Sequence, residues 1–116
     1  GTRADDRCDD PGTTARMVEC ADAAFRAADA RLNAVYRDVM ARLKAVDEAA
    51  GDGADRAGKL RAAQRAWIPL RDAQCTLEAA AAYGGTLAPV LEIGCRTRMT
   101  EDRTGALRSV ADDYDS

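Results

Sequence analysis

The stretch LRAAQRAWIPLRDAQC, residues 60–75, decides the fold. Wound as a helix at ~100° per residue, it places Trp67 and Cys75 in one narrow stripe, which suits a face turned toward a core. Gln64 and Arg71 fall in the same stripe. An amide and a guanidinium on such a face either complete a buried polar network or mark a binding site. We favour the buried network, and we expect Arg71 to have a partner, because burying an unpaired charge is strongly unfavourable.

Composition limits the class of protein. The chain has 116 residues, enough for one small domain with a modest core. Charged residues make up 32% of it and aromatic residues only 4%, so the core must consist mainly of alanine and aliphatic side chains, a profile that favours helices. Acidic and basic residues are interspersed at a net charge of −3, so no basic stripe is available for nucleic acid. We expect no nucleic-acid partner.

The cysteines indicate the compartment. Cys8, Cys20, Cys75 and Cys95 are widely spaced, without a CxxC pair, and the chain has no histidine, so we expect neither a metal nor a cofactor. An even cysteine count in a small acidic domain favours two disulfides in an oxidising compartment, and a reduced cytosolic protein is the alternative. No run of residues suits a transmembrane segment or a signal peptide. We therefore interpret the chain as a mature exported protein, periplasmic or secreted.

The apolar pattern predicts an all-α fold, in which a turn-rich arm (residues 1–12) precedes a single helical domain (residues 13–116). Thr13 or Thr14 can cap a first long helix. Its apolar positions step by three and four along Phe25, Ala28, Leu32, Val35, Val39, Leu43 and Val46. The glycine-rich residues 49–58 end this helix, which predicts a long antiparallel hairpin.

The remaining elements are predicted from their end signals. A second helix extends from about Asp55 to Tyr83, and Gly84 with Gly85 caps its C-terminus. Two shorter C-terminal helices follow: Thr86 can cap the first of them, with Pro89 in its first turn, and Thr100 the second.

The hairpin predicts which residues meet across it. If the two long helices fold back around residue 52, Asn33 lies level with Arg71, and Asp29, one turn before Asn33, lies level with Cys75. The carboxylate and the amide could then receive the forked guanidinium. We therefore predict a structural polar network of Asp29, Asn33, Gln64 and Arg71.

The same geometry predicts the disulfides. Around the turn at Gly84 and Gly85, Cys75 lies level with Cys95. Cys20 would be offset from Cys75 by roughly 13 Å along the helix axis, beyond the ~7 Å limit between bridged Cα atoms. The remaining pair is Cys8 with Cys20, and the arm is long enough to fold back beside the helix.

These residues resemble a known family. The order of Cys20, ADARLNAVY, LRAAQRAWIPLRDAQC, YGGTLAP, IGC and MTEDRTGAL is similar to that of the LprI family, a helical, disulfide-bonded, exported bacterial domain named for a lysozyme-inhibiting member. The resemblance covers nearly the whole chain, from Cys8 to Leu107. The characteristic positions, besides Asp29, Asn33, Gln64 and Arg71, are Leu32, Tyr36, Trp67, Asp72, Gly84, Gly85 and Arg103. The sequence departs from the family pattern at Pro69, which we place on the solvent side of its helix.

Two of these residues have alternative roles. Trp67 is either a core residue, which we favour, or a platform for a ligand. Arg103 is either a structural ion-pair donor, which we favour, or an anion site.

The sequence does not indicate an enzyme. It has no histidine, and neither Ser109 nor Ser116 has an obvious base beside it, so we expect no catalytic residue. The resemblance implies an inhibitor of c-type lysozyme or a binder of another cationic protein, and the acidic balance is compatible with such a partner. The segments able to reach an enzyme cleft are the arm with Arg3 and Arg7, the loop GDGADRAGK and the tip near Gly84. The alternatives are an envelope interaction or scaffold domain with an unknown protein partner, and a small-ligand carrier, which would need a cavity.

Overall fold

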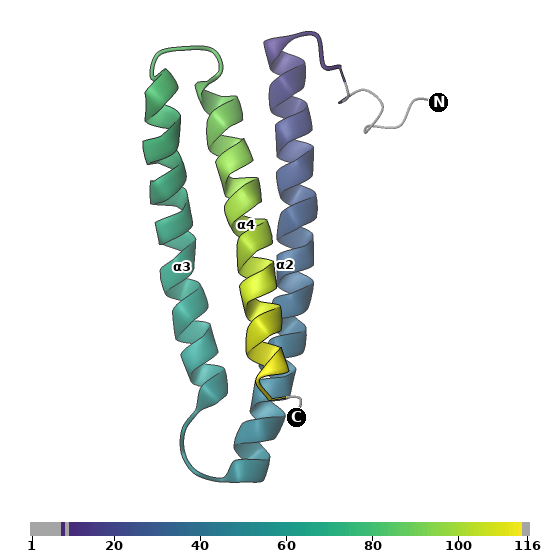
Figure 1. The fold of residues 1–116 in the computed structure, drawn as a ribbon, viewed down its shortest axis with the longest axis vertical. Coiled ribbons are helices and arrows are strands. Elements are labelled where there is room, and N and C mark those ends of the chain that lie inside the picture. Colours follow the sequence, from purple (N-terminus) through teal and green to yellow (C-terminus); the bar gives the residue numbers. More distant parts are fainter. Residues whose placement is uncertain (1–7, 9, 115–116) are drawn as a thin grey trace, which may run out of the picture.

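The computed structural model describes Cys8 and residues 10–114, and within them the chain is helical, with no strand (Figure 1). The elements are α2 (Thr14–Ala50), α3 (Arg56–Ala79), the 3₁₀ helix η1 (Ala80–Ala82) and α4 (Ala88–Asp112). The all-α fold and the long first hairpin are therefore confirmed. None of these helices is long and apolar enough to cross a membrane.

Helix α2 begins and ends as its sequence predicts. Thr13 is the N-cap, and its Oγ1 accepts a hydrogen bond from the N–H of Arg16 at 3.2 Å. Gly51 ends the helix in the left-handed conformation with φ of 56°, and its N–H donates to the carbonyl of Asp47 at 3.0 Å. The apolar stripe faces inward, and the buried residues of α2 are Ala28, Leu32, Val39, Met40 and Leu43.

Two carboxylates accept hydrogen bonds from the first backbone N–H groups of helix α3. Asp55 is the N-cap, and its Oδ1 accepts from the N–H of Gly58 at 3.0 Å. Asp47, from the last turn of α2, accepts from the N–H of Arg56 at 2.9 Å and from the N–H of Ala57 at 3.0 Å. Donors that a helix start leaves without an intrahelical partner are thus satisfied across the turn.

Pro69 interrupts neither α3 nor its packing. The helix continues through it to Ala79, and its side chain is exposed, as expected. A proline costs least on the solvent side of a helix, where its missing hydrogen bond can be tolerated by a slight bend.

The two predicted C-terminal helices are in fact one. Helix α4 runs without a break from Ala88 to Asp112, and Leu87, not Thr86, is the N-cap position. Thr100 resembles an N-cap in sequence because Glu101 and Asp102 follow it. In the structure Thr100 is completely buried in mid-helix, where its Oγ1 accepts from Arg71. The local signal was overridden by a tertiary contact.

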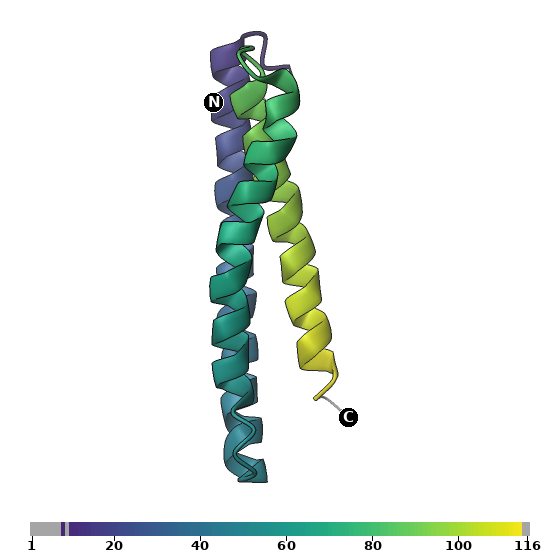
Figure 2. The ribbon, with the colours of Figure 1, turned by 90° about the vertical axis from the view of Figure 1, so that its left-hand side faces the viewer.

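The three helices form a flat molecule whose principal extents are 56 × 36 × 17 Å. Toward the end where α2 begins, α4 lies between α2 and α3 in both views (Figures 1 and 2), and toward the other end α4 diverges from them (Figure 2). Helix α4 contacts α2 more extensively than α3 does. The core lies between the helices and includes Leu32, Val39, Met40, Leu43, Leu60 and Leu107.

Both predicted disulfides are present. Cys8 is bonded to Cys20 with a Cα–Cα distance of 5.5 Å, and Cys75 to Cys95 with a Cα–Cα distance of 5.4 Å. The first holds the segment before α2 against that helix, and the second joins α3 to α4. All four cysteines are therefore occupied, and none is left to bind a metal.

Candidate binding surface

Trp67 lies between two arginines on the side of α3 that faces α4. The guanidinium carbon of Arg71 is 5.1 Å from the centroid of its ring, and that of Arg103, from α4, is 5.7 Å away. Gln64 accepts a hydrogen bond from Nε of Arg103 at 2.9 Å. Four of the family-characteristic residues therefore meet in one cluster, and the half-buried indole serves as a platform for side chains of the protein itself.

Arg71 is the buried charge of this cluster, with a relative exposure of 9%. Its guanidinium also lies over the ring of Phe25, at 5.3 Å from the centroid. Its Nε donates to Asp72 at 3.0 Å, and its Nη1 donates to the hydroxyl of Thr100 at 3.3 Å. Gln64 and Arg71 thus occupy a core-facing stripe because each has a polar partner, which is the structural answer that the sequence favoured.

The predicted partners of Arg71 were wrong. Asp29 accepts instead from Nδ2 of Asn33 on the same helix, at 3.4 Å, and the predicted network of Asp29, Asn33, Gln64 and Arg71 does not form as a unit. Asn33 would lie level with Arg71 only if α2 and α3 packed directly against each other along their whole length. Because α4 lies between them at this height, Arg71 reaches Thr100 of α4, and on α2 it reaches Phe25, about two turns before Asn33.

Other characteristic residues line a separate groove between α2 and α3. Asn33 and Tyr36 line it from α2, and Gln64 and Ile68 line it from α3. Leu32 is in the core, and Gly84 has the positive φ of 82° that the turn after η1 requires. The characteristic positions therefore divide between the Trp67 cluster, this groove, the core and the turn.

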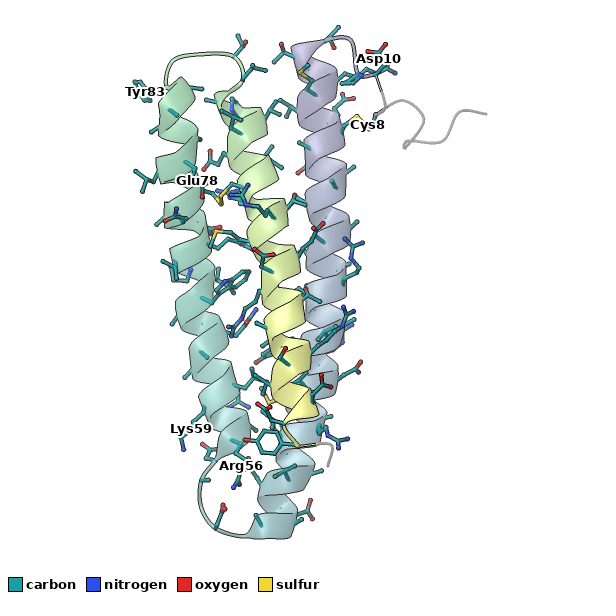
Figure 3. The ribbon with its side chains drawn as sticks, viewed as in Figure 1. Cys8, Asp10, Arg56, Lys59, Glu78 and Tyr83 are labelled. Atoms are coloured by element: carbon teal, nitrogen blue, oxygen red, sulfur yellow. A yellow bond between two sulfur atoms is a disulfide. The ribbon has the colours of Figure 1, made fainter. Side chains whose placement is uncertain are left out.

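Two of the three segments expected to reach an enzyme cleft can be assessed. In the loop GDGADRAGK, Arg56 forms ion pairs with Asp47 at 3.2 Å and Asp52 at 2.8 Å, and Nζ of Lys59 donates to the carbonyl of Ala54. Both cations, labelled in Figure 3, are thus engaged within the loop region. Arg3 and Arg7 lie outside the described residues.

The third segment, the tip near Gly84, exposes apolar side chains. Leu77 is 67% exposed, Tyr83 91%, Leu87 48% and Leu91 47%. We call these four residues the apolar tip; Tyr83 is labelled in Figure 3, at the end of the molecule opposite Arg56. The sequence indicated this turn by its glycines and placed Tyr83 at a helix end, but the exposure of the Tyr83 side chain was not predicted. A tyrosine directly before two glycines, at the end of a helix, was the available signal.

Two carboxylates near the second disulfide, Glu78 and Glu92, are tied to neighbouring side chains. Hydrogen bonds from Gln74 and Arg98 lower the pKa of Glu78, whose distance to Arg98 is 2.7 Å. Glu92 accepts from Thr76 at 3.0 Å and from Arg96 at 3.2 Å. General acids need a raised pKa, and Glu78 has the opposite shift. This cluster is suited to joining α3 to α4 rather than to moving protons.

The fold and these contacts define a small, all-helical, disulfide-bonded domain that offers grooves and an apolar tip for binding. The chain belongs to the LprI family: the family model described as "Lysozyme inhibitor LprI" matches residues 4–107. A protein of Rhizobium meliloti (strain 1021) that bears the name "Uncharacterized protein R02472" is 47% identical over 95 residues, which cover 78% of this chain and 68% of that protein. No solved structure matches the chain.

Proposed function

We propose that this protein acts outside the cytoplasm, in the periplasm or after secretion, where it binds and inhibits a c-type lysozyme or a similar cationic muramidase. The observation that carries the proposal is the family match over residues 4–107. Two disulfides support the compartment, since such bonds persist mainly under oxidising conditions. The net charge of −3 supports attraction to a cationic enzyme.

The apolar tip is the surface that we assign to the enzyme. Lysozymes of this type cut between sugars with two carboxyl groups in a cleft, so an inhibitor must fill that cleft or block its mouth. Tyr83 is the most exposed residue of the tip, and tyrosines are frequent anchors of protein interfaces. The Cys75–Cys95 bond joins the two helices that carry the tip and limits how far it can deform on binding.

A turbidity assay of lysozyme on cell walls, with a direct binding measurement, tests the proposal. Titration of the folded protein should slow lysis, and the association rate should fall as salt rises, since oppositely charged proteins steer each other. The absence of both inhibition and binding at tens of micromolar would contradict the proposal. Capture of a different envelope protein by the same surface would then support the alternative, an interaction domain with another partner.

A variant of the tip tests the assigned surface. Tyr83→Ala should weaken binding about tenfold or more, equivalent to about 1.4 kcal/mol, because it removes the anchor. It should unfold like the parent, since the side chain is almost fully exposed. The matched control is Leu70→Ala, which removes an exposed apolar side chain of α3 outside the tip. Equal inhibition by Tyr83→Ala and the parent would place the interface elsewhere and leave the inhibitor proposal standing.

A further inference from the structure

A second groove opens where α4 diverges from α3, and it has the lining of a small-molecule site. Its volume is about 300 Å³. The buried side chains of Leu43, Leu60 and Leu107 line it, one from each helix. Ala63 and Ala106 line it as well, and both are exposed and too small to close it. The result is an apolar groove on the side of the molecule where Figure 2 shows α4 diverging from α2 and α3.

Charge in this groove has one sign. Of the described residues that line it, Arg56, Lys59 and Arg103 are cationic and none is acidic. Arg56 is already neutralised by two carboxylates, and Lys59 donates to a backbone carbonyl. Arg103 differs from Arg56 because no carboxylate among the described residues lies within ion-pair distance of it. The expected role of Arg103 as a structural ion-pair donor is therefore not what the structure shows.

Arg103 is held in place by two contacts, but some of its hydrogen-bond donors have no partner among the described residues. Its Nε donates to Gln64 at 2.9 Å, and its guanidinium lies over Trp67. Its two Nη atoms make no hydrogen bond within the described part of the chain, and neither is fully buried, so they are accessible to solvent. Arg103 itself lines both this groove and the pocket beside Trp67. Partial burial lowers the pKa of this arginine, which means that its surroundings disfavour the unpaired charge. An anion at the Nη atoms would relieve that cost.

Asp102, the neighbour of Arg103, does not supply this anion. It lines a smaller pocket beside Trp67 and Met99, to which Arg103 also contributes, and it forms no ion pair with Arg103. Among the described residues that line the groove with the leucines, none is acidic. Within the described part of the chain, Arg103 is thus a cation without an anionic partner.

We infer that this groove binds a free fatty acid, with the acyl chain along Leu43, Leu60 and Leu107 and the carboxylate on the Nη atoms of Arg103. The planar fork of a guanidinium matches a carboxylate through two parallel hydrogen bonds. A volume of about 300 Å³ is at the lower end for ligand sites, so it suits one chain of medium length rather than the two chains of a phospholipid. This site is distinct from the apolar tip and does not depend on lysozyme binding.

Titration with sodium decanoate below its micelle-forming concentration, followed by NMR, tests the inference. The methyl signals of Leu43, Leu60 and Leu107 should shift in a saturable way. Decanol, which has the chain without the charge, and acetate, which has the charge without the chain, should each bind at least tenfold more weakly. Equal binding of decanol and decanoate would overturn the role of Arg103.

Two variants locate the site. Arg103→Gln should weaken decanoate binding at least tenfold, whereas Arg108→Gln, the same charge change at an exposed position of α4 outside the groove, should not. Arg103→Gln also removes a contact with Trp67, so Ala106→Leu provides an independent test. It fills the groove from an exposed position and should abolish binding while the protein stays folded.

Three outcomes would overturn the inference. The first is that the parent protein shows no saturable shifts with decanoate. The second is that Ala106→Leu binds decanoate as well as the parent does. The third is that sedimentation shows the parent to be a dimer that Ala106→Leu dissociates, which would assign the groove to a second copy of the chain.

Discussion

At the scale of single residues, Arg71 shows what makes a buried cation tolerable in so small a core. Its guanidinium lies over the faces of Phe25 and Trp67, and its nitrogens donate to Asp72 and Thr100. Only Asp72 among these partners carries a charge, and it is partly exposed. A lysine could reach the carboxylate, but it lacks the planar group that stacks on two rings while donating in two directions.

Replacing Arg71 should therefore cost stability. Arg71→Ala should lower the free energy of unfolding by about 2 kcal/mol, through lost ring contacts and a lost hydrogen bond to a buried hydroxyl. Urea unfolding at neutral pH measures this change. Arg65→Ala, at an exposed position of the same helix, should change it by less than about 0.5 kcal/mol. An Arg71→Ala protein as stable as the parent, but deficient in partner binding, would make Arg71 part of a site instead.

The sequence predicted the burial of Arg71 but not its partners. A helical stripe shows which residues share a face, because the spacing of side chains around one helix is fixed. It does not show which neighbouring helix lies opposite that face. Thr100 and Arg103 come from α4, and the position of α4 between the other two helices depends on packing along its whole length. For the same reason, the sequence did not predict that the Nη atoms of Arg103 are accessible.

At the scale of elements, the α2–α3 turn is held by charge. Asp47 accepts from the first backbone N–H groups of α3, and Asp52 pairs with Arg56. The hydrogen bond from Ala57 lowers the pKa of Asp47, and the side-chain hydrogen bond from Arg56 lowers the pKa of Asp52 to about 2. The turn therefore contributes stability only while these carboxylates are ionised.

Acid should weaken this turn. In the unfolded chain both carboxyl groups have ordinary pKa values of about 4, so below that pH the unfolded state takes up protons that the folded state resists. The stabilisation is thus complete above about pH 4 and is lost as the pH falls toward about 2. Asp52→Asn should reduce the slope of unfolding free energy against pH in this window. Asp38→Asn, at an exposed position of α2, should keep the slope of the parent.

The two disulfides should contribute unequally. Cys75→Ala with Cys95→Ala should lower the free energy of unfolding by about 3 kcal/mol, because that bond closes a separation of 20 residues between buried positions. Cys8→Ala with Cys20→Ala should cost less, since its separation is 12 residues and both ends are only half-buried. Thermal unfolding of the two double variants would compare them. A larger loss from the Cys8–Cys20 pair would contradict this ranking.

Prediction of the elements from sequence was most reliable where local signals acted alone. Thr13 and the glycine-rich residues after α2 mark ends that the structure confirms. The predicted end of the second helix at Tyr83 was wrong, because α3 ends at Ala79 and the chain tightens into η1 before the turn at Gly84. Prediction was also wrong at Thr100, where a residue with the appearance of a helix start is instead the buried acceptor of Arg71. The Cys75–Cys95 bond was predictable because a disulfide tolerates only a short axial offset between two helices, and Cys8–Cys20 then followed as the remaining pair.

At the scale of the whole molecule, the flat and elongated shape is unusual for its length. A compact chain of this size has a radius of gyration of about 13 Å. The structure has 17.8 Å. Small-angle scattering of the monomer should therefore give a value near 18 Å rather than near the compact one. A result close to the compact value would mean that the long α2–α3 hairpin does not stay extended in solution, because the 37 residues of α2 set the length of the molecule.

The positions of the two disulfides have a consequence for motion. Both lie toward the end of the molecule where α2 begins, whereas the α2–α3 turn and the last turns of α4 are joined only by side-chain packing and polar contacts. Amide hydrogens should accordingly exchange slowly near Cys75 and Cys95 and faster toward Val110, as local opening starts from the end without covalent bonds. The groove beside Arg103 lies toward the end of the molecule that has no disulfide. Transient separation of α4 from α3 would therefore admit a fatty acid whose acyl chain is longer than the closed groove can hold.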